Sequence, residues 1–106
     1  MELYQPLHPD SSSTFHFLRQ VNAKYHLSLA TYADLYAWST TYIHDFWETV
    51  WDETGVIGYK GDHVVDHAPV PGNPPWFSQA KINWAENLLA CRSSDKIALV
   101  QASTFT

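Results

Sequence analysis

Apolar residues in the first half of the chain recur with the spacing of amphipathic helices. A hydroxyl-rich run at residues 11–14 offers N-cap oxygens, and the apolar side chains that follow at intervals of three to four residues predict a helix over residues 13–26. Thr31 is a suitable N-cap for a second helix, with Asp34 placing negative charge in its first turn. The hydroxyl-rich residues 39–41 favour the end of that helix.

The clearest helical pattern begins at residue 43 and predicts a third helix that stops at Gly55. Its apolar stripe consists of Ile43, Phe46, Trp47, Val50 and Trp51. Four carboxylates lie mostly on the opposite face, at Asp45, Glu48, Asp52 and Glu53. Paired carboxylates perform acid–base chemistry when burial separates their pKa values, but this position favours a solvated face.

The pattern changes after Gly55, where glycines and prolines become frequent up to residue 79. Residues 69–75 contain four prolines and cannot form regular secondary structure, so we expect a long loop with a short extended piece at Val64 and Val65. A long loop in a small domain needs an anchor, and Trp76 and Phe77 are placed to supply one.

Two further elements are predicted after the loop. Apolar residues at three- to four-residue spacing predict a fourth helix over about residues 80–91. The run Ile97-Ala98-Leu99-Val100 has strand character, which residues 101–104 continue.

Composition narrows the classes of function. The chain has 106 residues, a formal net charge of -5 and six Lys+Arg, which fits one domain and argues against nucleic acid as a partner. There is no apolar run long enough to span a bilayer, no basic membrane-surface helix and no secretory signal pattern. We therefore expect no membrane partner and a reducing, cytoplasmic location, in which Cys91 is a small structural residue rather than a nucleophile.

Candidate metal ligands are His63 and His67, at the i, i+4 spacing that joins two imidazoles on one helical face. The intervening valines favour extended or turn structure, in which this spacing loses its meaning. A metal-dependent enzyme built on these histidines is therefore a minor alternative to two solvated side chains. The chain also lacks a Gly-rich phosphate loop and a nucleophile elbow, so it contains no recognisable active site.

Aromatic residues are the most informative excess, at 15% of the chain. One interpretation is an unusually aromatic core. The other is that some rings face a partner, because Trp, Tyr and Phe concentrate at interface anchors.

Five short motifs occur in an order that is typical of one protein family. They are YADLYAWS at 32–39, FWETVW at 46–51, VVD at 64–66, PWF at 75–77 and INWAENLL at 82–89. Together they resemble the N-terminal domain of the acetyl-CoA synthetase group of adenylate-forming enzymes, over about residues 15–101. The Ala-Glu-Asn-Leu-Leu ending is more similar to acetoacetyl-CoA synthetases. Ser78-Gln79-Ala80 departs from the Gly or Pro usual after Trp-Phe in this group, whereas Lys81 keeps the family's basic residue.

The resemblance implies a longer parent enzyme that activates a carboxylate with ATP and transfers the acyl group to coenzyme A. ATP, Mg and coenzyme A are thus cofactors of the parent, with none expected in this chain. The family's catalytic motifs lie downstream and have no matching positions here, and Lys81 and Lys96 do not match its catalytic lysine. No catalytic, cofactor-binding or metal residue is therefore assigned.

The resulting prediction is a mainly α fold: a small helical N-terminal cap domain with a long Pro/Gly loop and a C-terminal strand that would belong to a larger α/β domain. We expect an extended arm at 1–12, the helical domain at 13–94 and the start of a nucleotide-binding domain at 95–106. The predicted contacts with that larger body, or with another partner, are Trp76, Phe77, Asn83, Trp84 and Asn87.

Two functions therefore remain open. The first is a catalytically silent front piece of an acetoacetyl-CoA-synthetase-like ligase, whose partner is the remainder of the enzyme. The second is a stand-alone, aromatic-rich interaction or dimerisation module. Under either, Asn83 and Asn87 are candidates to fix helix and loop ends through hydrogen bonds to the backbone. Residues 97–104 are an unpaired apolar edge that predicts self-association of the isolated chain.

Overall fold

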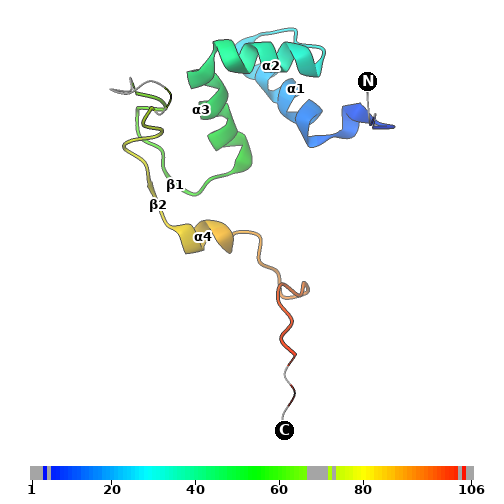
Figure 1. Ribbon diagram of the computed structural model, residues 1–106, viewed down its shortest axis with the longest axis vertical. Helices are drawn as coiled ribbons and strands as arrows, with labels where there is room; N and C mark the ends of the chain where they lie inside the picture. Colours follow the sequence, from blue (N-terminus) through cyan, green and yellow to red (C-terminus); the bar gives the residue numbers. More distant parts are fainter. Residues whose placement is uncertain (1–3, 5, 67–71, 73, 103, 105–106) are drawn as a thin grey trace.

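The computed structural model describes residues 4, 6–66, 72, 74–102 and 104, and it is mainly helical. Figure 1 shows helices gathered at one end of the molecule, a short ribbon of strands beside them, and a further short helix from which the C-terminal residues extend away. The elements are a 3-10 turn at Pro9–Ser11, α1 (Ser13–Tyr25), α2 (Tyr32–Thr41), α3 (Ile43–Thr54), β1 (Gly58–Tyr59), β2 (Lys81–Ile82) and α4 (Trp84–Leu88).

The first two helices begin where their N-caps predict. The Ser12 side chain accepts a hydrogen bond from the Phe15 amide at the start of α1. Thr31 and Asp34 form a reciprocal capping box at the start of α2, in which each side chain accepts from the other residue's backbone N–H. The backbone amides of Ala30 and Thr31 lower the pKa of Asp34, because they stabilise its ionised form.

The core lies where α1 and α2 meet. Its buried side chains are Leu18, Val21, Leu35 and Trp38, with Phe17, Tyr25, Leu27, Leu29 and Phe46 packed around them. The α1–α2 connection is held by Asn22, whose side chain donates to the Leu29 carbonyl and accepts from the Leu29 amide, both at 2.9 Å. The core is therefore partly aromatic, as one of the two interpretations of the composition predicted.

α2 passes directly into α3 through Tyr42, which is the C-cap of one helix and the N-cap of the next. The hydroxyls of Ser39, Thr40 and Thr41 donate to carbonyls one turn back, which is the local competition expected at a helix end. α3 then ends at Gly55 in the left-handed conformation, with φ 69°.

α3 has partners on two sides and thereby connects the helical core to the loop. Phe46 packs edge-to-face against Phe17 and Trp38 in the core. On the other side, Trp47 packs against Trp76, with 5.6 Å between ring centroids, and Trp51 packs against Phe77 at 4.8 Å. The prediction that Trp76 and Phe77 anchor the long loop is therefore confirmed.

A two-stranded antiparallel ribbon was missed by the sequence analysis. Tyr59 pairs with Lys81 and Gly58 with Ile82, although the pairing strands lie more than twenty residues apart. A Cβ at Gly58 would come within 2.6 Å of the Lys81 carbonyl, so the close approach of the strands needs glycine there. Nearby, Val65 forms an isolated bridge with Trp76, in agreement with the predicted extended piece.

The predicted helix over residues 80–91 is wrong at both ends. Lys81 and Ile82 pair with β1, and Asn83 caps the helix by accepting a hydrogen bond from the Glu86 amide. α4 therefore covers only Trp84–Leu88, because strand pairing and capping override the helical spacing before it.

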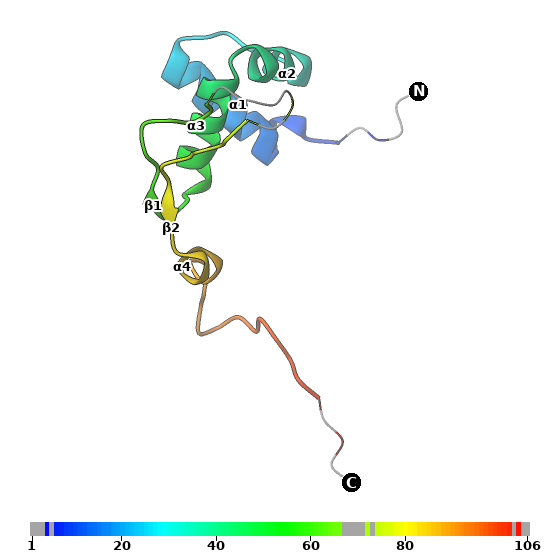
Figure 2. The same cartoon turned by 60° about the vertical axis from the view of Figure 1, so that its left-hand side comes forward.

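The molecule is elongated, with extents of 60 × 42 × 29 Å and a radius of gyration of 18.9 Å. A compact domain of this length has a radius of gyration of about 13 Å. Figure 2 shows the reason: α4 and the residues that follow it, which we call the tail, extend away from α1, α2 and α3 rather than folding onto them. Residues 97–102 form neither helix nor strand, so the predicted C-terminal strand has no partner within the described part of the chain.

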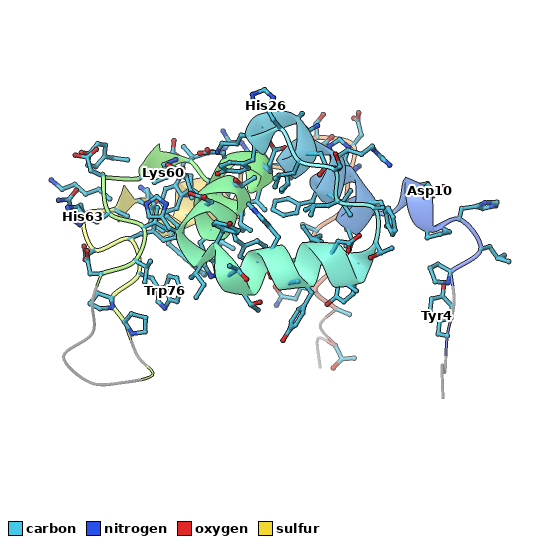
Figure 3. All side chains as sticks on the ribbon, turned by 90° about the horizontal axis from the view of Figure 1, so that it is seen from above. Tyr4, Asp10, His26, Lys60, His63 and Trp76 are labelled. Atoms are coloured by element: carbon cyan, nitrogen blue, oxygen red, sulfur yellow. The ribbon has the colours of Figure 1, made fainter. Side chains whose placement is uncertain are left out.

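A group of charged residues ties α1 and the ribbon to the polar face of α3. Lys60, which is labelled in Figure 3, contacts Asp52 at 2.9 Å and Glu48 at 3.4 Å, and Lys24 contacts Asp52 at 3.3 Å. Burial alone would raise the pKa of Asp52, but the hydrogen bonds from Lys60 and Lys24 outweigh it and hold the pKa below its ordinary value. The carboxylate face of α3 is thus partly neutralised rather than simply solvated.

We predict that Asp52→Asn destabilises the chain by about 0.5–1 kcal/mol at neutral pH, a small value because salt and water screen these half-exposed groups. Since the folded-state pKa is lowered, the stabilisation is present above the ordinary carboxylate pKa and disappears as the pH falls through the lowered value. Urea unfolding at several pH values measures the difference. Glu53→Gln is the control, because Glu53 makes no ion pair in the described residues, and an equal loss in both variants would contradict the network.

Candidate functional site

The most conspicuous surface of the molecule is apolar and lies on α4 and the tail. It comprises Trp84, Leu88, Leu89, Ile97, Leu99 and Val100, and we name it the α4–tail surface. Trp84 is 71% exposed and Leu99 is 93% exposed. No residue of α4 is buried. Several large apolar side chains that remain exposed in this way favour an interaction surface over a core.

Asn87 fixes α4 to the rest of the chain. Its side-chain oxygen accepts from the Ile57 amide at 2.8 Å, and its side-chain nitrogen donates to the carbonyls of Ile57 at 2.8 Å and Asn83 at 2.9 Å. One half-buried amide thus joins the helix to the segment before β1, thirty residues away. Together with the Asn83 cap, these bonds confirm that both asparagines fix chain ends through the backbone.

Trp76, which is labelled in Figure 3, and Phe77 pack against Trp47 and Trp51 of α3. They line an apolar hollow of about 190 Å³ together with Trp47. Phe77 has a φ of 43°, a left-handed conformation that is strained for a bulky residue. Its amide donates to the Val64 carbonyl at 2.8 Å and its carbonyl accepts from Ala80 at 2.8 Å, so the turn is held by backbone hydrogen bonds on both sides.

The five residues predicted to contact a partner therefore fall into two groups. Trp84 is open to solvent beside Asn83 and Asn87, whereas Trp76 and Phe77 already have partners on α3. The sequence analysis used Leu88 and Leu89 only to predict a helix and did not identify them as exposed residues. The shortness of α4, which begins only after the Asn83 cap, is the signal that would have placed them outside the core.

The candidate metal ligands are not brought together by a helix. His63 lies in irregular structure, where its Nδ1 contacts Asp66 at 2.8 Å, and Ser78 donates to the other Asp66 oxygen at 2.6 Å. His67 lies outside the described residues. His44, Asp45 and Glu48 each place a ligand atom within 4.8 Å of the others, but His44 is exposed and Glu48 already contacts Lys60.

A second apolar feature lies among α1, α2 and α3, at the opposite end of the molecule from the tail. It is a hollow of about 360 Å³, which we name the tyrosine groove. Its lining is aromatic and aliphatic with a few hydroxyl groups, and consists of Phe17, Tyr32, Leu35, Tyr36, Phe46, Val50, Ser13, Thr14, Ser39 and Thr54. Tyr32 and Tyr36 are exposed, one helical turn apart on α2, and no lining residue is charged.

A family model described as acetyl-coenzyme A synthetase N-terminus matches residues 32–88, from the start of α2 to the end of α4. The match covers more than half of the chain. The chain belongs to this family. The matched segment contains all five predicted contact residues and ends on the α4–tail surface.

The relatives of this synthetase N-terminal domain are much longer proteins. Acetoacetyl-CoA synthetase of Xenopus tropicalis is 37% identical over 107 residues, which cover 96% of this chain and 16% of the relative. Malonamoyl-CoA synthetase of Penicillium aethiopicum is 45% identical over 76% of this chain and 12% of its own length. Acetoacetyl-CoA synthetase of Danio rerio is 40% identical over 91% of this chain and 15% of its length. No solved structure matches the chain.

The chain thus spans about one sixth of the length of these relatives. Within the described residues, no helix of the domain is both long enough and apolar enough to cross a membrane.

We predict that Asn87→Asp loosens α4 selectively. The aspartate keeps an acceptor for the Ile57 amide but turns a carboxylate oxygen toward the carbonyls of Ile57 and Asn83, which it cannot satisfy. Loss of these bonds from a half-buried group costs about 1–3 kcal/mol. Amide hydrogen exchange at Ile57 and Leu89 should accelerate accordingly, with exchange in α1 unchanged. Glu86→Gln is the control on the same helix, and equal acceleration in both variants would refute the role of Asn87.

Proposed function

We propose that this chain is the N-terminal structural domain of an acetoacetyl-CoA-synthetase-like, AMP-forming acyl-CoA ligase. The observation that carries the proposal is the α4–tail surface, a set of apolar side chains left exposed by the described residues, which begins at the end of a segment that matches the synthetase N-terminus family. The domain's role is to cover part of a larger catalytic body and to help shape the intact enzyme.

The physical support is the distribution of apolar side chains between inside and outside. The helical end buries a small core, whereas α4 and the following residues expose a tryptophan, three leucines and two further aliphatic residues. Removing these apolar side chains from water lowers the free energy of the protein, so their exposure favours packing against a partner. In relatives of this chain more than four fifths of the sequence lies outside the matched part, and we assign the partner to that remainder.

The proposal extends to the chemistry of the parent. The parent activates a short-chain acid with ATP and Mg²⁺ to an acyl-adenylate and then forms a thioester with coenzyme A, in the cytoplasm. This domain binds none of these cofactors and contributes no catalytic residue. Its residues 95–106 begin the nucleotide-binding domain, with residues 97–104 as a strand that pairs in the parent's sheet.

A second candidate is a free-standing interaction module. The observation that favours it is the tail itself, because Ile97, Leu99 and Val100 are almost fully exposed and have no pairing partner in the described residues. Under this alternative, and equally in the isolated ligase domain, the tail associates with a second copy of the chain.

We predict that the purified 106-residue chain supports no ATP–pyrophosphate exchange with acetoacetate. A chimera of Danio rerio acetoacetyl-CoA synthetase, in which this chain replaces the matched N-terminal part, should retain exchange within about tenfold of the natural enzyme. Exchange by the isolated chain would contradict the silent-domain proposal. A chimera that folds but fails to catalyse exchange would favour the interaction module instead.

We further predict that Trp84→Asp in this chimera lowers its stability by about 2–4 kcal/mol, the loss expected for an aromatic anchor at a desolvated interface. Thermal unfolding monitored with residual activity measures the effect. Leu7→Asp is the control, since Leu7 is equally apolar, 92% exposed and outside the matched segment. If both substitutions have the same effect, α4 does not dock against the body of the enzyme.

A further inference from the structure

We propose that the hollow beside Trp47 binds a small molecule that carries a quaternary ammonium group. The hollow has a volume of about 190 Å³ and is lined by Trp47, Trp76 and Phe77, and we name it the tryptophan corner. None of these residues belongs to the α4–tail surface, so the inference is independent of the synthetase role proposed above.

The first support is the arrangement of the rings. The Trp47 and Trp76 rings have centroids 5.6 Å apart and planes at 62°, so they form two walls that meet at an angle. Phe77 is the third lining residue, and its ring packs on Trp51 with 4.8 Å between the centroids. Trp47 and Trp76 are 39% and 43% exposed, so a ligand reaches both residues from solvent.

The second support is that the loop side of the corner is held in place before a ligand binds. The Phe77 amide donates a hydrogen bond to the Val64 carbonyl at 2.8 Å, and the Asp66 amide donates to the Pro75 carbonyl at 3.1 Å. These two bonds lie on either side of Trp76 in the sequence and fix its backbone. Binding to rings that are already in position costs less conformational entropy than binding that must order them.

The third support is the chemistry of the lining, which selects the class of ligand. Aromatic ring faces attract a cation that lies within about 6 Å of the ring centroid, and tryptophan does so most strongly. The lining side chains carry no charge and no hydrogen-bond acceptor, since an indole N–H only donates. A primary ammonium would therefore leave N–H donors unsatisfied in the corner. A quaternary ammonium has no N–H donor, so it keeps the attraction to the rings without that cost.

The same features argue against other occupants. The tyrosine groove adds aliphatic side chains and hydroxyls to its rings, so its lining is not selective for such a cation. The tryptophan corner is smaller than the roughly 300–1,000 Å³ pockets that enclose drug-sized ligands, which favours a compact group. The backbone of residues 75–77 is already paired within the chain, which leaves few partners for a peptide. We therefore assign the occupant to a small molecule rather than to a methylated lysine of another protein.

The test is titration of the 106-residue chain with related probes, followed by two-dimensional NMR of the indole N–H groups. Choline carries a quaternary ammonium, ethanolamine carries a primary ammonium with N–H donors, and dimethylbutanol has carbon in place of the charged nitrogen. Trimethyllysine amide represents a methylated side chain. Trp76→Leu removes one wall of the corner, and Trp84→Leu is the matched control because Trp84 is 71% exposed on α4. Circular dichroism establishes that both variants keep their helices.

We expect choline to shift the indole signals of Trp47 and Trp76 saturably, with a dissociation constant about fivefold or more below those of ethanolamine and dimethylbutanol. Trp76→Leu should raise the choline dissociation constant about fivefold or more, because one of the two tryptophan faces is lost. Trp84→Leu should leave it unchanged.

Equal binding of choline and dimethylbutanol would make the corner an apolar site without selectivity for charge, and equal binding of ethanolamine would remove the argument from N–H donors. Either result overturns the proposal, as does a choline shift that does not saturate or an equal loss in the two variants. Tighter binding of trimethyllysine amide than of choline overturns the assignment to a small molecule. The comparison of probes on the natural chain decides the proposal even if Trp76→Leu disturbs the loop.

Discussion

The arrangement of this chain depends on α3, which packs aromatic side chains on two sides. Through Phe46 it closes the core formed with α1 and α2, and through Trp47 and Trp51 it holds the return of the loop at Trp76 and Phe77. Ring pairs of this kind add specific geometry to the burial of large apolar surfaces. Without them the Lys60 ion pairs with Asp52 and Glu48 would be left to hold the ribbon beside α3.

The elements governed by short-range interactions were predictable from the sequence. The Thr31–Asp34 capping box, the apolar stripe of α3 and the left-handed stop at Gly55 depend on residues within a few positions of one another. The ribbon was not predictable, because Tyr59 and Lys81 reveal their pairing only after the loop between them has folded back. The same long-range pairing shortened the fourth helix, since residues in a strand cannot satisfy a helical ladder.

The candidate site also combines residues with short-range partners, which the sequence can indicate, and residues with long-range partners, which it cannot. Asn83 was a candidate to fix a helix or loop end, but the predicted helix over residues 80–91 placed it in the interior, whereas it caps α4 by accepting a hydrogen bond from the Glu86 amide. The role of Asn87 became visible only in three dimensions, because its partner is the backbone of Ile57. Aromatic composition indicated that some rings would remain uncovered, but composition does not distinguish Trp84, which is open, from Trp76, which packs on Trp47.

The hydrogen bonds of Asn87 fix the position of α4, from which the exposed C-terminal residues continue. By joining α4 to Ile57, they orient the helix so that the chain leaves it away from the core. The tail would otherwise gain free energy by covering apolar surface of its own chain, but that surface lies at the other end of a molecule 60 Å long. Both candidate functions proposed above cover the tail with a partner outside these residues, either the body of a larger synthetase or a second copy. The two candidate functions, a synthetase domain and an interaction module, therefore rest on the same observation, which is the separation of the tail from the core.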